Sequence, residues 1–149
     1  MFDNKSKKIS KAEIELIEQN LGIKFPVSFI EHYIHFNGGT PEKSYFYSED
    51  SDIEIEVQLF LPLKYKIEEF DIDTVEHKYM LFQQKSELMN IFIPFANDYG
   101  ANQICLNVNN GTIYIVYMDL GELSERCFKY LCEDFNTFVT GLSECSIDE

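Results

Sequence analysis

The longest hydrophobic pattern in the chain runs from residue 91 to residue 119 and predicts three consecutive strands. Residues 91–96 form an almost unbroken apolar run, which is typical of a strand buried on both faces. In residues 104–108 every second side chain is Ile, Leu or Val, and residues 112–118 are mostly β-branched or aromatic. These patterns predict a β-meander at the centre of the fold.

Two groups of turn residues separate the three segments. Residues 97–100 (Asn-Asp-Tyr-Gly) favour a turn after the first strand. Asn110 and Gly111 predict a tight type I′ hairpin between the second and third, because both central residues of that turn need a positive φ.

A further strand is predicted for residues 53–61, where apolar and polar side chains alternate strictly. Pro62 ends this strand, since proline has no amide hydrogen to donate within a sheet. One face is expected to be buried and the other to contact water. The buried face carries Ile53, Ile55, Val57, Leu59 and Leu61, and the wet face carries Glu54, Glu56 and Gln58.

The N-terminal part of the chain predicts a helical hairpin. Ser10 and Glu13 form the S-x-x-E pattern of a capping box, and Gly22 stands where a helix end favours a left-handed residue. Pro26 suits the first turn of a second helix, and residues 37–39 (Asn-Gly-Gly) end it. The expected apolar stripes are Ile14, Ile17 and Leu21 in the first helix, and Phe29, Ile30, Tyr33 and Phe36 in the second.

Two more helices are expected later in the chain. Residues 73–76 (Asp-Thr-Val-Glu) predict the start of one, and residues 134–142 form the other. We interpret residues 126–132 as a short strand and residues 38–52 as a loop. The pattern of residues 64–73 is ambiguous. The apolar stripes are Val75, Tyr79, Phe82 and Met89, and Phe135, Phe138, Val139 and Leu142.

Helices at both ends of a group of strands predict an α+β fold. We expect an N-terminal helical hairpin, a mostly antiparallel or mixed sheet around the central meander, and a C-terminal helix. A chain of 149 residues fits one domain. The predicted domain spans residues 9–142, with a flexible arm at residues 1–8 and an acidic tail at residues 143–149.

The net charge of −14 is carried entirely by the part of the chain after residue 43. Residues 1–43 hold six Lys against six acids, whereas residues 44–149 hold five Lys and one Arg against twenty acids. Direct nucleic-acid binding is disfavoured, because it depends on basic contacts to phosphates. A basic protein partner would instead be attracted. The alternative is that this acidity only keeps the protein soluble.

The chain contains no apolar run near the ~20 residues of a transmembrane helix. Its N-terminus, MFDNKSKKIS, is charged and lacks the apolar core of a signal peptide. We therefore expect a cytoplasmic protein that does not bind membranes. The four cysteines form no C-x-x-C pair and are expected to be free thiols.

Histidine and cysteine positions give little support to a catalytic or metal site. His32 and His35 lie three apart on a predicted helix, but no Cys or acid completes a metal site by spacing. We favour ordinary core or surface histidines. Cys127 and Cys132 are interpreted as thiols that fill the core, rather than as redox or metal groups.

The acidic residues also favour structural roles. Asp98 and Asp119 bracket the meander, but Asp at turns and strand ends commonly bonds its own backbone. Residues 49–52 (Glu-Asp-Ser-Asp) lack the spacing and the Gly of a calcium-binding EF-hand loop. No P-loop, G-x-S-x-G or G-x-G-x-x-G motif occurs. We predict no enzymatic activity, no cofactor and no metal site.

A partner-binding surface is predicted where aromatic and acidic residues adjoin. Aromatic anchors surrounded by acids suit the recognition of a basic protein. The alternative is that these aromatic side chains are half-buried cover for the core. This predicted acidic surface consists of Tyr45, Tyr47, Glu49, Asp50, Asp52, Glu54 and Glu56.

Three segments in this order resemble a known family. Residues 9–39 place Leu-Gly-Ile-Lys-Phe-Pro between two helices, and Asn-Gly-Gly follows the second. Residues 93–98 (Ile-Pro-Phe-Ala-Asn-Asp) precede Ile-Cys-Leu at 104–106 and Ile-Tyr at 113–114, and residues 133–138 read Glu-Asp-Phe-Asn-Thr-Phe. They are similar to the N-terminal signature, the central core and the closing helix of the SUKH superfamily. That superfamily is named partly for a yeast cell-wall assembly regulator (SMI/KNR-like) and includes many bacterial immunity proteins.

The chain departs from the family pattern at two turns. Tyr99-Gly100-Ala101 stands where the family often has Gly-Gly. Residues 117–119 (Tyr-Met-Asp) stand where an aromatic-Asp ending commonly contains Trp. These departures leave the expected fold intact and affect only a site built on that turn.

The resemblance implies an α+β fold and a binding role without catalytic machinery. In bacteria such proteins are typically encoded beside polymorphic toxins and neutralise them by direct binding, while eukaryotic relatives act as regulatory adaptors. We therefore expect an immunity protein that binds a basic cognate toxin domain. The alternative is a non-enzymatic regulatory scaffold that binds a host protein. The family's partner surface varies, so the resemblance assigns no binding residue, and the oligomeric state is left open.

Overall fold

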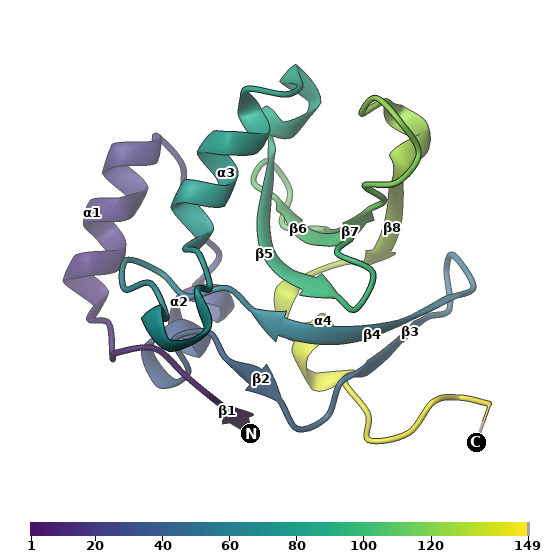
Figure 1. Ribbon diagram of the computed structural model, residues 1–149, viewed down its shortest axis with the longest axis horizontal. Helices are drawn as coiled ribbons and strands as arrows, with labels where there is room; N and C mark the ends of the chain where they lie inside the picture. The colour runs from purple at the N-terminus through teal and green to yellow at the C-terminus, as the bar shows by residue number, and fades with distance from the viewer. Residues whose placement is uncertain (149) are drawn as a thin grey trace.

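The computed structural model describes residues 1–148, which form a six-stranded antiparallel sheet flanked by helices (Figure 1). Each strand of this sheet pairs with the next in the chain, so the whole sheet is a meander. The sheet curves so that its two edge strands approach each other, and Ser48 Oγ donates to the Leu131 carbonyl between them at 2.7 Å. The strands are β3 (Tyr45–Ser48), β4 (Ile53–Phe60), β5 (Phe92–Asp98), β6 (Gln103–Asn107), β7 (Ile113–Val116) and β8 (Phe128–Cys132).

The α-helices precede the sheet, interrupt it between β4 and β5, and close the chain, and a 3-10 helix lies between β7 and β8. A separate two-stranded ribbon pairs β1 (Phe2–Asp3) with β2 (Thr40–Pro41). The predicted α+β class, with an N-terminal helical hairpin and a C-terminal helix, is confirmed. The α-helices are α1 (Lys11–Leu21), α2 (Val27–His35), α3 (Val75–Gln83) and α4 (Phe135–Thr140), and the 3-10 helices are η1 (Glu68–Phe70), η2 (Glu87–Asn90) and η3 (Glu125–Cys127).

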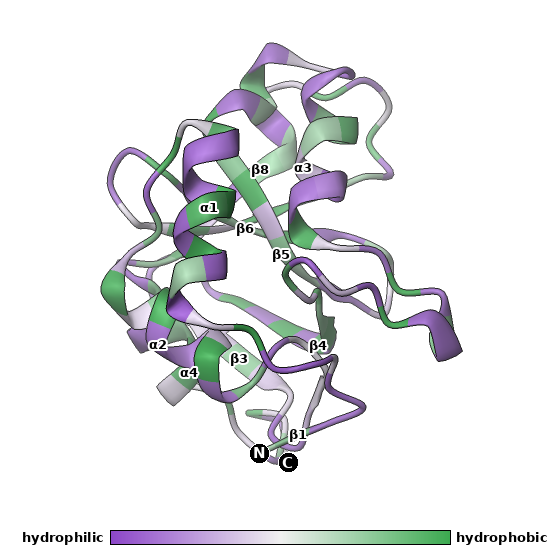
Figure 2. Cartoon of the chain, turned by 90° about the vertical axis from the view of Figure 1, so that its left-hand side faces the viewer, coloured by the Kyte–Doolittle hydropathy of each residue, from purple (hydrophilic) through white to green (hydrophobic). Residues whose placement is uncertain are grey.

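The predicted ends of α1 are confirmed. Ser10 and Glu13 form a complete capping box, which satisfies amide donors that the first turn leaves without partners. Gly22 follows the helix with φ +69°, the left-handed conformation in which glycine avoids a steric penalty. Figure 2 shows that hydrophobic and hydrophilic residues alternate along α1, as a helix with one buried face requires.

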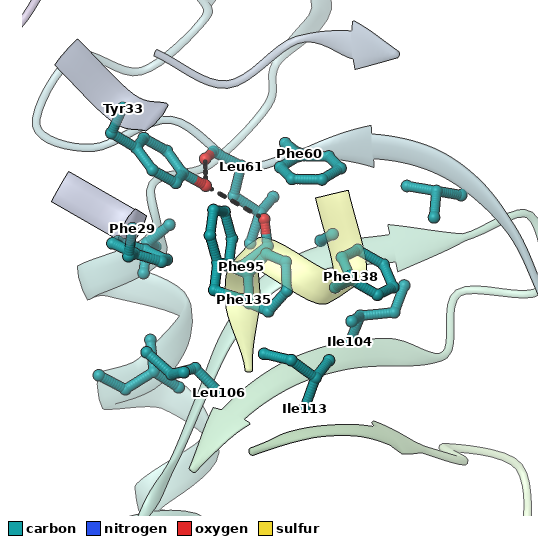
Figure 3. Packing of buried hydrophobic residues seen from close by; sticks show 14 of the residues in the cluster. Phe29, Tyr33, Phe60, Leu61, Phe95, Ile104, Leu106, Ile113, Phe135 and Phe138 are labelled. Carbon is teal, nitrogen blue, oxygen red and sulfur yellow. Dashed lines mark hydrogen bonds between the residues drawn. The ribbon is translucent and has the colours of Figure 1, made fainter. Parts of the chain in front are cut away.

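The main core lies between the sheet and the helices α1, α2 and α4 (Figure 3). Phe29 packs edge-on against Phe135 at a centroid distance of 5.0 Å, and Phe95 approaches Phe135 to 5.3 Å. The hydroxyl of Tyr33, which is fully buried, donates to the Leu61 carbonyl at 2.7 Å. Truncating one such buried aromatic ring to Ala would cost about 3–5 kcal/mol.

A second, smaller core covers the other face of β5, β6 and β7. The side chains of Phe92, Cys105 and Val116 point there from the three strands. Phe82 of α3, Met89 of η2 and Cys127 of η3 cover them, together with partly exposed neighbours. The strands β5 and β6 are therefore buried on both faces over most of their length, which explains the unbroken apolar run in β5.

The prediction of a loop over residues 38–52 is wrong for much of its length. Thr40 and Pro41 form β2, and residues 45–48 form β3. Phe46 points into the core and lies 4.9 Å from Phe138 between ring centroids. Three consecutive aromatic residues here form a strand whose alternate side chains face the core and the surface.

The strict alternation predicted for residues 53–61 holds only as far as Val57. The pairing of β4 with β5 shifts register between Val57 and Leu59. This irregularity turns Phe60 into the core, where it is fully buried, and leaves Leu59 half-buried. A bulge inside a strand depends on its neighbour, and residues 53–61 alone do not show it.

The predicted type I′ turn at Asn110 and Gly111 is wrong in type. Gly111 has φ +79°, but Asn110 is not among the residues with positive φ. The Gly111 amide donates to the Asn107 carbonyl at 2.8 Å, so the loop is wider than two residues. Asparagine side chains hold it, since Asn107 Oδ1 accepts from the Asn109 amide and Asn110 Oδ1 from the Thr112 amide.

Two other segments differ from their expected form. The helix α3 ends at Gln83, so Met89 lies in η2 rather than on the same helix. Residues 1–8, expected to be a flexible arm, contact the domain in this structure, because Phe2 is buried 4.9 Å from Phe60 between ring centroids.

Candidate partner-binding surface

The hairpin of β3 and β4 brings together four residues of the predicted acidic surface. Tyr45 pairs with Glu56, and Tyr47 pairs with Glu54. Paired residues of antiparallel strands project to the same face, so these four side chains are neighbours. All four are half-buried, and Phe46 between the tyrosines points to the opposite, buried face.

The other three residues of the predicted acidic surface lie in the turn that joins β3 to β4. Glu49, Asp50 and Asp52 are exposed, and none of them forms an ion pair within residues 1–148. The Tyr47 hydroxyl donates to Asp52 Oδ1 at 2.7 Å, and this hydrogen bond raises the pKa of Tyr47. The hairpin thus ends in a group of carboxylates that are free to attract a cation.

The C-terminal segment covers part of this hairpin. The backbones of Ser143 and Tyr45 exchange two hydrogen bonds, of 3.0 and 2.8 Å. The carboxylate of Glu54 then accepts from the Ser146 hydroxyl at 2.5 Å and from the Ile147 amide at 2.8 Å. Glu54 therefore binds the protein's own tail, which leaves Glu56 and the turn carboxylates as the open acids of the hairpin.

Sequence reasoning missed a row of four aromatic side chains on the second-core face of β5, β7 and β8. Phe92 lies 4.8 Å from Phe128 and 5.1 Å from Tyr114 between ring centroids. Tyr114 lies 5.7 Å from Tyr130, its partner across the strands, at an angle of 89°. We call Phe92, Tyr114, Phe128 and Tyr130 the aromatic row.

The aromatic row differs from the main core in exposure. Phe92 is nearly buried, whereas Tyr114, Phe128 and Tyr130 are each half-buried. In Figure 1 this face of the sheet lies between α3 and the segment that joins β7 to β8. In the sequence, the alternation of Ile113 and Ile115 with Tyr114 indicates that Tyr114 lies on the face opposite the two isoleucines. The pairing of β7 with β8 is needed to bring Tyr130 and Phe128 to the same face.

A surface hollow of about 460 Å³ lies beside the second core. It is lined by Lys85, which follows α3, and by Met118, Gly121, Glu122 and Leu123. Met118 and Leu123 also pack against the second core, as do Tyr114 and Phe128. Residues of the hollow and of the aromatic row therefore pack against the same hydrophobic core.

Two of the buried cysteines, Cys105 and Cys132, are poorly placed for nucleophilic chemistry. Burial raises the pKa of the Cys105 thiol far above its usual range, and burial also raises that of Cys132 to about 12. Cys127 and Cys132 lie in different cores, Cys127 in the second and Cys132 in the main one. A thiol that stays protonated is a poor nucleophile and a poor metal ligand.

The aspartate and histidine candidates do not form a metal or catalytic group in the described part of the chain. Asp98 Oδ1 accepts from the amides of Gly100 and Asn102, both at 2.9 Å, as expected of an Asp that organises a turn. His32 and His35 line a surface hollow of about 430 Å³ between α2 and α4. Within residues 1–148, no three His, Cys, Asp or Glu side chains are placed to hold a metal ion.

Across the same residues, no helix has the length and apolar composition needed to cross a bilayer.

Comparison with known proteins identifies the family of the chain. Residues 8–141 match the SMI1 / KNR4 family (SUKH-1), a span that includes both helices of the N-terminal hairpin, the whole sheet and α4. A search of curated proteins finds no match. Because the match covers most of the chain, this protein belongs to the SMI1 / KNR4 family (SUKH-1).

Proposed function

We propose that this protein is an immunity protein that binds a cognate toxin domain and blocks it by occlusion, without catalysing a reaction. Membership of the SUKH-1 family supports a binding role, because the family resemblance implies neutralisation of toxins encoded nearby. The observation that carries the proposal is the set of unpaired carboxylates on the β3–β4 hairpin, beside half-buried tyrosines.

The charge of the surface indicates the class of toxin. Unpaired acids attract a basic partner over distances of about a Debye length, ~8–10 Å at physiological ionic strength. Aromatic side chains then contribute contact area that holds the complex once formed. A basic domain, such as one that acts on nucleic acids, fits this surface, and a strongly acidic partner does not.

Co-expression with the product of the adjacent gene tests the proposal. We expect this protein to restore growth of cells that produce the toxin domain, and to co-purify with that domain. A protein that neither restores growth nor co-purifies with the neighbour would contradict the proposal.

The alternative is a regulatory scaffold that binds a host protein, and the same experiment separates the two. A scaffold would leave the toxicity of the neighbouring product unchanged and would co-purify with a protein encoded elsewhere. The adjacent gene also discriminates, since a large secreted protein with a variable C-terminal domain supports immunity.

A further inference from the structure

The aromatic row has two hydroxyl groups that form no hydrogen bond with the described part of the chain. The side-chain hydroxyls of Tyr114 and Tyr130 form no hydrogen bond with any residue in 1–148, although both rings are half-buried. Half-buried aromatic residues with a free polar end are enriched in protein interfaces, because one end is apolar and the other is hydrated.

Two carboxylates lie at the Tyr130 end of the row. Ser51 Oγ donates to the Tyr130 carbonyl at 2.6 Å, which holds the acidic turn of the β3–β4 hairpin against β8. Glu133 follows β8 directly. Desolvation raises the pKa of Tyr130, and the negative charges of Asp50 and Glu133 raise it further, so both carboxylates lie within electrostatic reach of the ring.

Neither carboxylate is neutralised by the protein. Asp50 and Glu133 are exposed and form no ion pair with any other residue that the structure describes. Lys129 is adjacent to Tyr130 in sequence, but it pairs with Ile115, a residue of the main-core face, and so projects to the opposite face of β8. The end of the aromatic row is thus an apolar platform beside two unpaired negative charges.

We propose that the aromatic row, with Asp50 and Glu133, is the anchor site for the toxin and takes an arginine side chain from a loop of the toxin domain. This inference rests on the proposed function and names the chemistry of its contact. The planar guanidinium stacks on the face of Tyr130, whose ring lies at 89° to that of Tyr114, while its N–H groups donate to the two carboxylates. Arginine fits better than lysine, because a compact ammonium has neither a planar face that stacks on an aromatic ring nor a fixed fork of N–H donors.

The anchor site and the predicted acidic surface meet at Asp50. Glu54 is already bound to Ser146 and Ile147, so the outer face of the hairpin is partly occupied. We assign the remaining hairpin acids to long-range attraction and the aromatic row to the close contact that slows dissociation.

A titration with short peptides tests the anchor without any knowledge of the toxin. The protein, labelled at its tyrosines for NMR, receives a blocked hexa-arginine peptide and then a blocked hexa-lysine peptide. We expect the ring signals of Tyr114 and Tyr130 to move, with an affinity for hexa-arginine at least about threefold higher than for hexa-lysine. Ring signals that stay unmoved, or equal affinities for the two peptides, would overturn the proposal.

Charge variants show whether the site or the total charge binds the peptide. D50N/E133Q should weaken hexa-arginine binding at least about fivefold. E68Q/E69Q removes the same charge from two exposed residues of η1 and should change the affinity less than about twofold. Equal losses in the two variants would mean that the peptide responds to net charge alone, which contradicts an anchor at β8.

The adjacent toxin domain then separates this inference from the proposed function. Y114L/Y130L keeps apolar volume but removes both aromatic faces, and a thermal melt confirms that it folds. We expect its Kd for the toxin domain to rise at least about tenfold. If the variant binds as tightly as the wild type, the anchor is wrong and the immunity function stands. If the wild type itself does not bind, the proposed function fails, and the peptide titration still decides whether the anchor site exists.

Discussion

His32 lies among aromatic rings, and its Nε2 atom is buried without a hydrogen-bond partner in the described part of the chain. Its ring centroid is 5.0 Å from that of Phe2 and 5.3 Å from that of Phe135. Desolvation by burial and, to a smaller extent, the charge of the nearby His35 together lower the pKa of His32 to about 4. This packing agrees with the expectation of an ordinary core or surface histidine. The sequence alone did not show how strongly the His32 ring is desolvated.

We predict that protonation of His32 destabilises the protein in acid. The unfolded chain has the ordinary histidine pKa of 6.5, so it binds a proton before the folded protein does. The contribution of neutral His32 is complete above about pH 6.5 and is lost as the pH falls towards 4, to a total of about 3 kcal/mol. Urea denaturation at pH 7 and near pH 4 measures this.

The variant H32F isolates the effect, since Phe packs among aromatic rings and cannot be protonated. It should lose less stability between the two pH values than the wild type. V27F, which places a Phe at an exposed position of the same helix and keeps every titratable group, serves as the control and should behave like the wild type. Equal acid losses in wild type and H32F would show that other groups cause the destabilisation.

At the scale of single elements, local rules predicted the helices better than the strands. The capping box and Gly22 set the ends of α1, because both act through atoms within a few residues. The bulge in β4, by contrast, depends on how that strand meets β5. The strand β3 was missed because two of its three aromatic residues face outward, and only pairing with β4 showed that they belong to a sheet.

We predict that S10A lowers the free energy of unfolding by about 1 kcal/mol, because the first turn of α1 loses its side-chain acceptor. Chemical denaturation with an unchanged m-value measures the loss. K11A, at the exposed first residue of the helix, is the matched control and should be close to neutral. An S10A variant as stable as K11A would mean that the cap contributes nothing.

At the scale of the whole molecule, the distribution of charged residues determines where oppositely charged molecules are attracted. All of the excess negative charge follows residue 43, and the fold places part of it on the β3–β4 hairpin and at the end of β8. Four ion pairs are found within residues 1–148, and none of them neutralises the hairpin acids. Under the proposed function, these unpaired acids would attract a basic partner to the β3–β4 hairpin and the end of β8.

We predict that association with the toxin domain slows steeply with salt. The association rate should fall at least about tenfold between ~0.05 and ~0.5 M NaCl, while dissociation changes little. E56K should slow association severalfold, whereas E15K, on the exposed surface of α1, should slow it less. Stopped-flow measurements give these rates, and association that is indifferent to salt would contradict electrostatic steering.

The sequence by itself determined the fold class, the central meander, the ends of α1 and the family resemblance. These features rest on periodicity and on contacts between residues close in the chain. The predicted acidic surface also came from the sequence, because its residues lie on one hairpin. Only the tertiary structure decided the rest: the bulge in β4, the tail bound to Glu54, and the aromatic row beside Asp50 and Glu133. Each of these features joins residues far apart in the chain. Sequence patterns describe neighbours along the chain, so such contacts follow only from how the strands pair and how the sheet curves.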